Sequence, residues 1–192
     1  MNTAIKTWKY KNRIVSIISD ESGCLSFEDV RNPKVKMVMM HKRYALPNDL
    51  GLESGDYVRW EEVMNAIKEQ AKGAVIFPLY MYDHSGLSFS LGDFRDKWDS
   101  GQVGFIWMEA PTNKEEALKA CMAEVSILNE IENGEVFACE LIEITKCVVC
   151  GHTHENVVDA MHGIIGMDGA MHFVRTENGF KEVVKKGKEV MI

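Results

Sequence analysis

Residues 103–145, VGFIWMEAPTNKEEALKACMAEVSILNEIENGEVFACELIEIT, predict a strand, a helix and a second strand in succession. The run VGFIWM is apolar over the length of one strand, and residues 135–145 alternate between apolar and polar as a half-buried strand does. Between them, Thr112 and Glu115 have the T-x-x-E spacing of a capping box, which opens a helix. The apolar residues of this helix recur on one face, at Leu118, Cys121, Met122, Val125 and Leu128.

Further elements are expected on both sides of this stretch. They are strands at residues 13–19, 35–41, 74–82 and 87–90, and a helix at residues 56–72 that Asp56 caps. Pro78 has no N–H to donate to a neighbouring strand, which predicts a sheet edge or a bulge there. Beyond Lys146 the periodicity weakens, with a short strand expected at residues 170–174 and a weak helix or tail at the C-terminus. Because helices and strands do not alternate strictly, the sequence predicts an α+β fold with a mostly antiparallel sheet and two main helices.

Length and composition restrict the class of protein. The chain has 192 residues, of which 46% are hydrophobic and 27% charged, so we expect one globular domain over residues 1–192. No apolar run reaches the roughly 18 residues of a membrane span, which argues against a membrane protein. The five cysteines are odd in number and irregularly spaced, so we expect reduced thiols and a cytoplasmic location.

The net charge of −7 is unevenly distributed. Residues 1–96 contain 13 basic and 13 acidic residues, whereas residues 97–192 contain 9 and 16. Ten of those acids fall between Glu109 and Glu155. They form either a solvated surface or an acidic surface that fills a basic groove on a nucleic-acid enzyme. The acidic balance argues against direct nucleic-acid binding by the chain.

A cysteine and histidine cluster is the strongest candidate metal site. Cys147, Cys150, His152 and His154 supply thiolate and imidazole ligands of the kind that Zn²⁺ prefers. A structural zinc site usually has a second, more distant pair of ligands, which His162, His172 or Cys139 could provide. The alternative is a turn with two reduced cysteines and two surface histidines. No other motif requires a cofactor, since the phosphate-binding, dinucleotide-binding and zinc-protease motifs are all absent.

Two polar loops are further candidates. Asp83, His84 and Ser85 follow an apolar strand, but neighbouring side chains point in different directions and cannot form a catalytic relay by themselves. They form either a binding loop or a turn that bonds its own backbone. Trp98, followed by a short polar segment up to Gln102, is either a recognition loop or a packed turn.

These loops also carry a family resemblance. The segments HKRY at 41–44, LYMYDHSG at 79–86 and WDSGQVGFI at 98–106 occur in this order, followed by a segment from Glu124 to Val136. They resemble a family of small proteins encoded by phages, prophages and other mobile elements, largely without assigned function. The resemblance spans about residues 35–137. Residues 138–192, with the cysteine and histidine cluster, depart from the family's pattern.

The mobile-element resemblance implies an anti-defence protein of the anti-CRISPR or antirestriction type, acting in the host cytoplasm. It would bind a host nucleic-acid-targeting nuclease, or its nucleic-acid complex, and inhibit it. The residues expected to bind this partner are His41, Arg43, Tyr44, Tyr82, Asp83, His84, Trp98, Asp99, Gln102, Glu130, Glu132 and Glu135. A competing interpretation is a metal-dependent enzyme acting on phosphodiesters or nucleotides, in which His41, Asp83, His84 and Asp99 hold a divalent ion. A third is a structural accessory protein of the phage, and a homodimer is compatible with all three.

Overall fold

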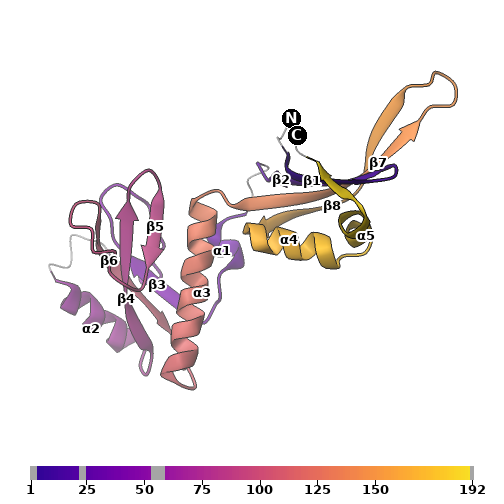
Figure 1. Cartoon of the computed structure of the whole chain (residues 1–192). Helices are drawn as coiled ribbons and strands as arrows, with labels where there is room; N and C mark the ends of the chain where they lie inside the picture. The colour runs from indigo at the N-terminus through magenta and orange to yellow at the C-terminus, as the bar shows by residue number, and fades with distance from the viewer. Residues whose placement is uncertain (1–3, 22–24, 53–58, 191–192) are drawn as a thin grey trace. The chain divides into compact units, whose positions relative to one another are not determined.

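The computed structural model describes residues 4–21, 25–52 and 59–190. The chain divides into two compact units (Figure 1). Unit 1 combines the two ends of the chain, Met1–Ser26 and Gly134–Ile192, and unit 2 is the central segment Phe27–Asn133. The sequence suggests one domain with a change of character near residue 137, whereas the units meet at residues 26/27 and 133/134. Whether they unfold as one cooperative domain stays a prediction.

Unit 2 contains a four-stranded antiparallel sheet and the two main helices. The strands are β3 (Val35–Met39), β4 (Val75–Asp83), β5 (Leu87–Ser90) and β6 (Ser100–Met108), in the order β3-β6-β4-β5. The helices are α1 (Phe27–Val30), α2 (Trp60–Gln70) and α3 (Lys114–Glu132). Asp56, the expected cap of α2, lies outside the described residues, and Arg59 occupies the N-cap position.

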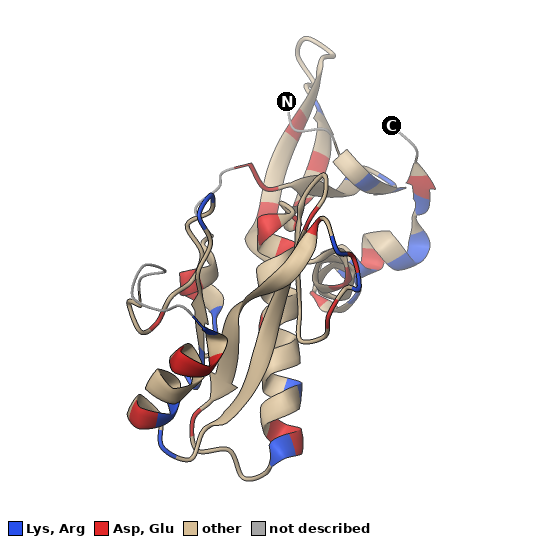
Figure 2. Cartoon of the chain, turned by 90° about the vertical axis from the view of Figure 1, so that its left-hand side faces the viewer, with Lys and Arg blue, Asp and Glu red and all other residues tan. Residues whose placement is uncertain are grey.

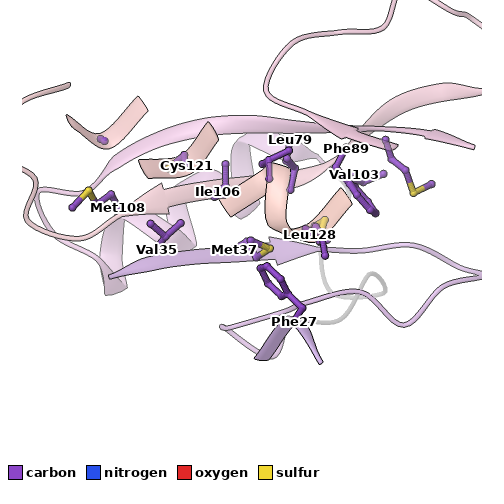
Figure 3. Packing of buried hydrophobic residues seen from close by; sticks show 14 residues of the cluster. Phe27, Val35, Met37, Leu79, Phe89, Val103, Ile106, Met108, Cys121 and Leu128 are labelled. Atoms are coloured by element: carbon purple, nitrogen blue, oxygen red, sulfur yellow. The ribbon is translucent and has the colours of Figure 1, made fainter. Parts of the chain in front are cut away.

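Both faces of this sheet are buried, which explains the unbroken apolar run of β6. On one face, Met37, Leu79 and Ile106 pack with Cys121 and Leu128 of α3 (Figure 3). On the other face, a second cluster combines the sheet residues Val38, Phe105 and Trp107 with Val63 and Ile67 of α2. A strand with both faces covered needs no polar alternation, so residues 103–108 are all buried.

Close backbone packing holds β3 against β6. A Cβ atom added at Gly104 would lie 1.8 Å from the carbonyl oxygen of Val38. Only glycine fits at this point. In β4, the ladder with β6 shifts register between Leu79 and Tyr80, next to Pro78, and β5 pairs only with Tyr80 to Asp83. At Pro78 itself β4 has no β5 partner, which matches the sheet edge that was one of the two expectations, and the extra residue of the adjacent bulge is Val103 of β6.

Unit 1 contains a five-stranded antiparallel sheet with two helices. Its strands are β1 (Ala4–Tyr10), β2 (Arg13–Ser19), β7 (Val136–Lys146), β8 (Thr153–Ile165) and β9 (Lys188–Val190), in the order β8-β7-β2-β1-β9. Helices α4 (Met167–Thr176) and α5 (Phe180–Lys186) contribute Ala170, Val174, Phe180 and Val183 to the core. These residues pack with Trp8, Val15, Ile17, Cys139 and Leu141 of the sheet.

The β7–β8 hairpin is longer than the sheet that supports it (Figure 1). Strand β2 pairs with β7 from Phe137 to Glu143, and the N–H of Ile144 donates to the carbonyl of Asn12 at 2.7 Å. Beyond Ile144 the described hairpin consists of two strands without a third neighbour. Every residue of β8 from Thr153 to His162 is exposed. We call residues 144–156 the ribbon, and residues 147–151 its tip.

The fold class is confirmed. The described residues contain nine strands, in two antiparallel sheets, and five helices. Two local predictions are wrong. The strand expected at residues 170–174 is part of α4, because Ala170 and Val174 are spaced to bury one helical face. The capping box is displaced by one residue: Asn113 is the N-cap of α3, and Glu116 accepts from the backbone N–H of Thr112. Among the described helices, none is both long and apolar enough to cross a membrane.

Candidate functional site

Three of the quoted sequence motifs meet at one end of the unit 2 sheet. Strand β4 ends at Asp83, strand β6 begins at Ser100, and the chain after β3 passes beside them. The residues brought together are His41, Arg43, Tyr44, Tyr82, Asp83, His84, Trp98, Asp99 and Gln102, which we call the motif cluster. These are nine of the twelve residues expected to bind a partner.

Asp83 joins two of the motifs. Its Oδ2 accepts hydrogen bonds from Arg43 Nη1 at 3.0 Å and from Tyr44 Oη at 2.9 Å. Its backbone N–H donates to the carbonyl of Asp99 at 2.8 Å, which attaches the third motif. The His41 ring stacks on Tyr44 with 5.0 Å between centroids. The carboxylate therefore holds the loops in place, and Arg43 balances its charge.

His84 and Asp99 form a second polar pair. His84 Nδ1 lies 3.1 Å from Asp99 Oδ2, and His84 stacks against Tyr82. Asp96 fixes the adjacent turn, because its carboxylate accepts from the backbone N–H groups of Asp99 and Trp98, which lower the pKa of Asp96. The indole of Trp98 is 94% exposed, so it does not cover a core.

A pocket of about 410 Å³ opens beside the cluster. His41, Asp83 and Asp99 line it with Arg43 and Gln102, whereas His84 does not. Of the four residues expected to hold a divalent ion in the enzyme interpretation, three therefore line one pocket. Their ligand atoms do not form a compact group, because the single set of three such residues with mutually close ligand atoms in the described chain lies elsewhere.

The expected acidic surface is divided between the units. Glu130 and Glu132 lie in the last turn of α3 in unit 2, and Glu135 begins unit 1. Counted by unit, unit 2 contains 12 basic and 18 acidic residues, and unit 1 contains 10 and 11. The excess negative charge thus belongs almost entirely to unit 2. Within unit 1, the long hairpin is nevertheless acidic on balance, because it holds Glu140, Glu143, Glu155 and Asp159 against one basic residue, Lys146. Figure 2 shows Asp and Glu on its strands.

The tip of the ribbon brings together the set of possible metal ligands. The ligand atoms of Cys147, Cys150 and His154 all lie within 4.8 Å of one another, and this group could hold a metal ion. A tetrahedral zinc site with ordinary bond lengths separates thiolate and imidazole ligand atoms by about 3.5–3.8 Å, so small side-chain movements would complete it. The expected ligand His152 is not in the group. Cys139 and His162 are not in the group either. Cys139 is buried, and His162 Nδ1 lies 3.5 Å from Asp20 Oδ2.

Backbone hydrogen bonds shape this tip. The N–H of Cys147 donates to the carbonyl of His152 at 2.8 Å, and the N–H of Gly151 donates to the carbonyl of Cys147 at 2.9 Å. Gly151 has a φ of +75°, which closes the turn in a conformation that favours glycine. The N–H groups of Cys150 and Val149 point at the sulfur of Cys147 and lower the pKa of that thiol. The turn therefore favours the thiolate, the form that binds metals.

Two apolar residues at the tip were not predicted as functional from the sequence. Val148 is 99% exposed and Val149 91% exposed, between the two cysteines. Apolar side chains that are this exposed, at the end of a projecting ribbon, have no role in the chain's own core. The available signal was their position between Cys147 and Cys150 in the C-x-x-C segment.

Comparison with known proteins adds no relative. No family model, no curated protein and no solved structure matches this chain.

Proposed function

We propose that this chain is a partner-binding protein that inhibits a host nucleic-acid-targeting nuclease, and that the ribbon is its docking element. The observation that carries the proposal is the tip, where two almost fully exposed valines project between possible metal ligands. The mobile-element resemblance of residues 35–137 supplies the class of partner.

The valines provide the contact energy in this proposal. Fully burying one valine side chain is worth roughly 1.5–3 kcal/mol, so a partner that encloses Val148 and Val149 gains a substantial part of a binding free energy. A narrow ribbon reaches a recessed surface that a flat sheet face cannot reach. The hairpin ladder is already formed, so binding orders few additional residues.

The acids of the hairpin provide orientation. Glu140, Glu143, Glu155 and Asp159 lie along its strands, against the one basic residue Lys146. Nucleases that hold DNA or guide RNA have basic channels, and complementary charge accelerates association and fixes the register of docking. The acidic β7–β8 hairpin, with its apolar tip, fits the entrance of such a channel.

We further propose that Cys147, Cys150 and His154 hold Zn²⁺. Thiolate and imidazole ligands match the preference of this ion, and the N–H groups directed at the Cys147 sulfur favour its bound form. A two-stranded hairpin is marginally stable in water, so a metal at the tip would hold the ribbon in shape. Three protein ligands leave a fourth position for water or for a ligand from the partner.

Nuclease inhibition tests the proposal directly. Purified protein is added to a panel of host effector nucleases, including CRISPR effectors and restriction enzymes, and cleavage of labelled DNA is followed. We expect one of them to be inhibited, and V148S/V149S to weaken inhibition at least about tenfold while zinc content is retained. The matched control is L118S/M122S, which removes two exposed apolar side chains from α3. Inhibition of no nuclease, or equal loss in both double variants, would contradict the proposal.

A second pair of variants locates the acidic contact. E155Q/D159N neutralises two acids of β8, and E130Q/E132Q/E135Q neutralises the acids around the end of α3. We expect the β8 variant to slow association with the nuclease at low salt and the α3 variant to have little effect. The opposite result would place the acidic contact at the end of α3 and remove the ribbon from the docking surface.

A second candidate function is an enzyme acting on phosphodiesters or nucleotides. The pair His84 and Asp99 at 3.1 Å, next to the pocket of the motif cluster, specifically favours it. Asp99 orients the imidazole through Nδ1, which leaves Nε2 for proton transfer. Turnover of bis-p-nitrophenyl phosphate or of cyclic nucleotides, with and without Mn²⁺, tests this function. Activity that H84A abolishes, and that V148S/V149S retains, would establish the enzyme.

A further inference from the structure

Unit 1 also contains a large basic cavity that none of the sequence motifs indicates. It has a volume of about 890 Å³ and is formed by residues of β1, α4, α5 and β9. Five cationic residues line it: Lys6, Arg175, Lys181, Lys185 and Lys186. We call this cavity the basic groove. Figure 2 shows Lys and Arg residues gathered on α5 and the segment next to it.

The charge of the groove is strongly positive within an acidic protein. Two carboxylates, Glu182 and Glu189, are among its lining residues. Glu182 binds Lys186 at 2.9 Å and raises the pKa of that lysine. None of the other four cations forms an ion pair with a residue that the structure describes. Four cations thus line one cavity without an ion-pair partner among the described residues.

The floor of the groove is apolar. Trp8 is 6% exposed, and Met171 and Val184 lie beside it in the cavity wall. The combination of a cationic rim and an apolar floor suits a ligand that joins anionic groups to flat, weakly polar ones. An isolated phosphate would occupy a small part of 890 Å³ and would not use the floor.

We propose that the basic groove binds a short segment of single-stranded nucleic acid, with backbone phosphates at the lysine and arginine rim and a base against the partly exposed side chains of Met171 and Val184. Single-strand sites typically combine a positive groove with aromatic or apolar surfaces for the bases. A duplex keeps its bases stacked inside, so it would meet the rim but not the floor. This site is independent of the ribbon and of nuclease inhibition.

The competing occupant is an acidic peptide, which also complements the rim. Both ligands carry one negative charge on every unit, so the apolar floor decides between them. Each nucleotide carries a base that can cover the floor, whereas a run of aspartate or glutamate offers only carboxylates and short aliphatic stems.

Fluorescence anisotropy tests the site. A fluorescein-labelled ten-nucleotide oligo-dT is titrated with the full-length protein at 50 mM salt and again at 200 mM salt. We expect saturable binding that weakens steeply with salt, with a slope in log Kd against log salt of about 0.7 for each phosphate neutralised. A duplex of the same length and a poly-glutamate peptide of equal charge serve as competitors, and we expect both to compete at least tenfold more weakly.

Paired charge variants assign the binding to the groove. R175Q/K185Q removes two unpaired cations of the rim, and we expect it to weaken oligo-dT binding about tenfold and to lower the salt slope by about 1.4. The matched control K9Q/K146Q removes two exposed lysines of unit 1 that do not line the groove, and we expect less than a twofold change. Circular dichroism melting confirms that both variants fold.

Three results would overturn the proposal. One is the absence of oligo-dT binding at 50 mM salt. A second is equal weakening in the two double variants, which would show that only net charge matters. The third is poly-glutamate competing as strongly as oligo-dT, which would assign the groove to an acidic peptide.

Discussion

The two units bury their sheets in different ways. The sheet of unit 2 lies between α3 on one face and α2 on the other, so its central strand β6 is apolar throughout. The sheet of unit 1 packs with α4 and α5, and its longest hairpin continues past the third strand. The strands of unit 2 therefore use their apolar residues for the core, and its most exposed apolar residue, Trp98, lies in a loop. Unit 1 leaves apolar side chains and possible metal ligands at the end of a ribbon.

This difference also separates the cysteines. Cys121 and Cys139 are fully buried, and burial raises the pKa of Cys121 to about 12 and of Cys139 to about 11. Cys147 is at the tip, where backbone N–H groups lower its pKa. The same residue type is thus inert packing in the cores and a potential metal ligand on the ribbon.

The largest expected effect is on the double-sided core of unit 2. G104A places a Cβ against the Val38 carbonyl, which forces β3 away from β6. We expect a loss of about 3 kcal/mol or more in the free energy of unfolding, because the backbone cannot yield as a flexible side chain would. Denaturant titration measures it, and the control is G101A in the same motif, where an added Cβ meets no atom within 4 Å. Equal stability of the two variants would show that the strands are not packed this closely.

The next effect concerns the ribbon alone. C150S removes one of the three ligands, and we expect zinc affinity to fall by more than about 100-fold, since even outer-shell changes cost 10–100-fold. Competition with a chromogenic chelator measures the affinity. Hydrogen exchange should accelerate at Ile144 and Thr145 and stay unchanged in β6. H152A is the control, because His152 is not in the ligand group. A loss of zinc affinity in H152A would show that His152 is also a ligand.

A smaller effect separates the two kinds of cysteine by reactivity. At pH 7.5 iodoacetamide should label Cys147 at least about tenfold faster than Cys121 or Cys139, because its thiolate is favoured and theirs are suppressed. Zn²⁺ should protect Cys147 and leave the others unaffected. Peptide mass spectrometry at timed intervals gives the rates. Rapid labelling of Cys121 in the folded protein would contradict the closed core of unit 2.

The smallest effect tests a buried carboxyl group in unit 2. Glu124 is 1% exposed and accepts from the backbone N–H of Asn32 through both oxygens, at 3.1 Å, and burial raises its pKa. A raised pKa in the folded state stabilises the fold fully below the unfolded value near 4.3, and this contribution is lost as the pH rises through the folded value.

E124Q keeps an acceptor for the Asn32 N–H and removes the titration. We therefore expect its stability to vary less than that of the wild type between pH 4 and pH 7, by about 1 kcal/mol at most. Urea titrations at several pH values measure the difference. E115Q, at an exposed position of the same helix, is the control, and an unchanged pH dependence in E124Q would show that Glu124 does not titrate differently on folding.

Much of the fold follows from local patterns. The periodicity of α3 and the apolar run of β6 were predictable, because each depends on residues close together in the chain. Pro78 in the same way predicted the local edge of the sheet. Strand β8 was not recognised, because its residues from Thr153 to His162 are exposed on the hairpin and lack the alternation of a half-buried strand. The segment at 170–174 was misassigned because a five-residue apolar run fits a strand or a buried helical face equally well.

The candidate sites divide in the same way. Cys147 and Cys150 were predicted together because the C-x-x-C spacing and Gly151 bring both sulfurs to one turn. The pairing of Asp83 with Arg43, 40 residues apart, could be suspected only from the resemblance. The basic groove had no signal, since Lys6 and Lys185 lie at opposite ends of a chain whose net charge is negative.

By itself the sequence determined the α+β class, the two main helices and the cysteines and histidines of the possible metal site at 147–154. Only the tertiary structure decided that the hairpin extends beyond its sheet and that three loops form one cluster. It also decided that residues between Lys6 and Trp8 line one basic groove with residues between Met171 and Glu189. The physical reason is the separation along the chain of the residues that interact. Turns, caps and amphipathic faces are set by neighbours within a few residues, whereas strand pairing and cavity formation depend on long loops closing, at an entropic cost that no local pattern encodes.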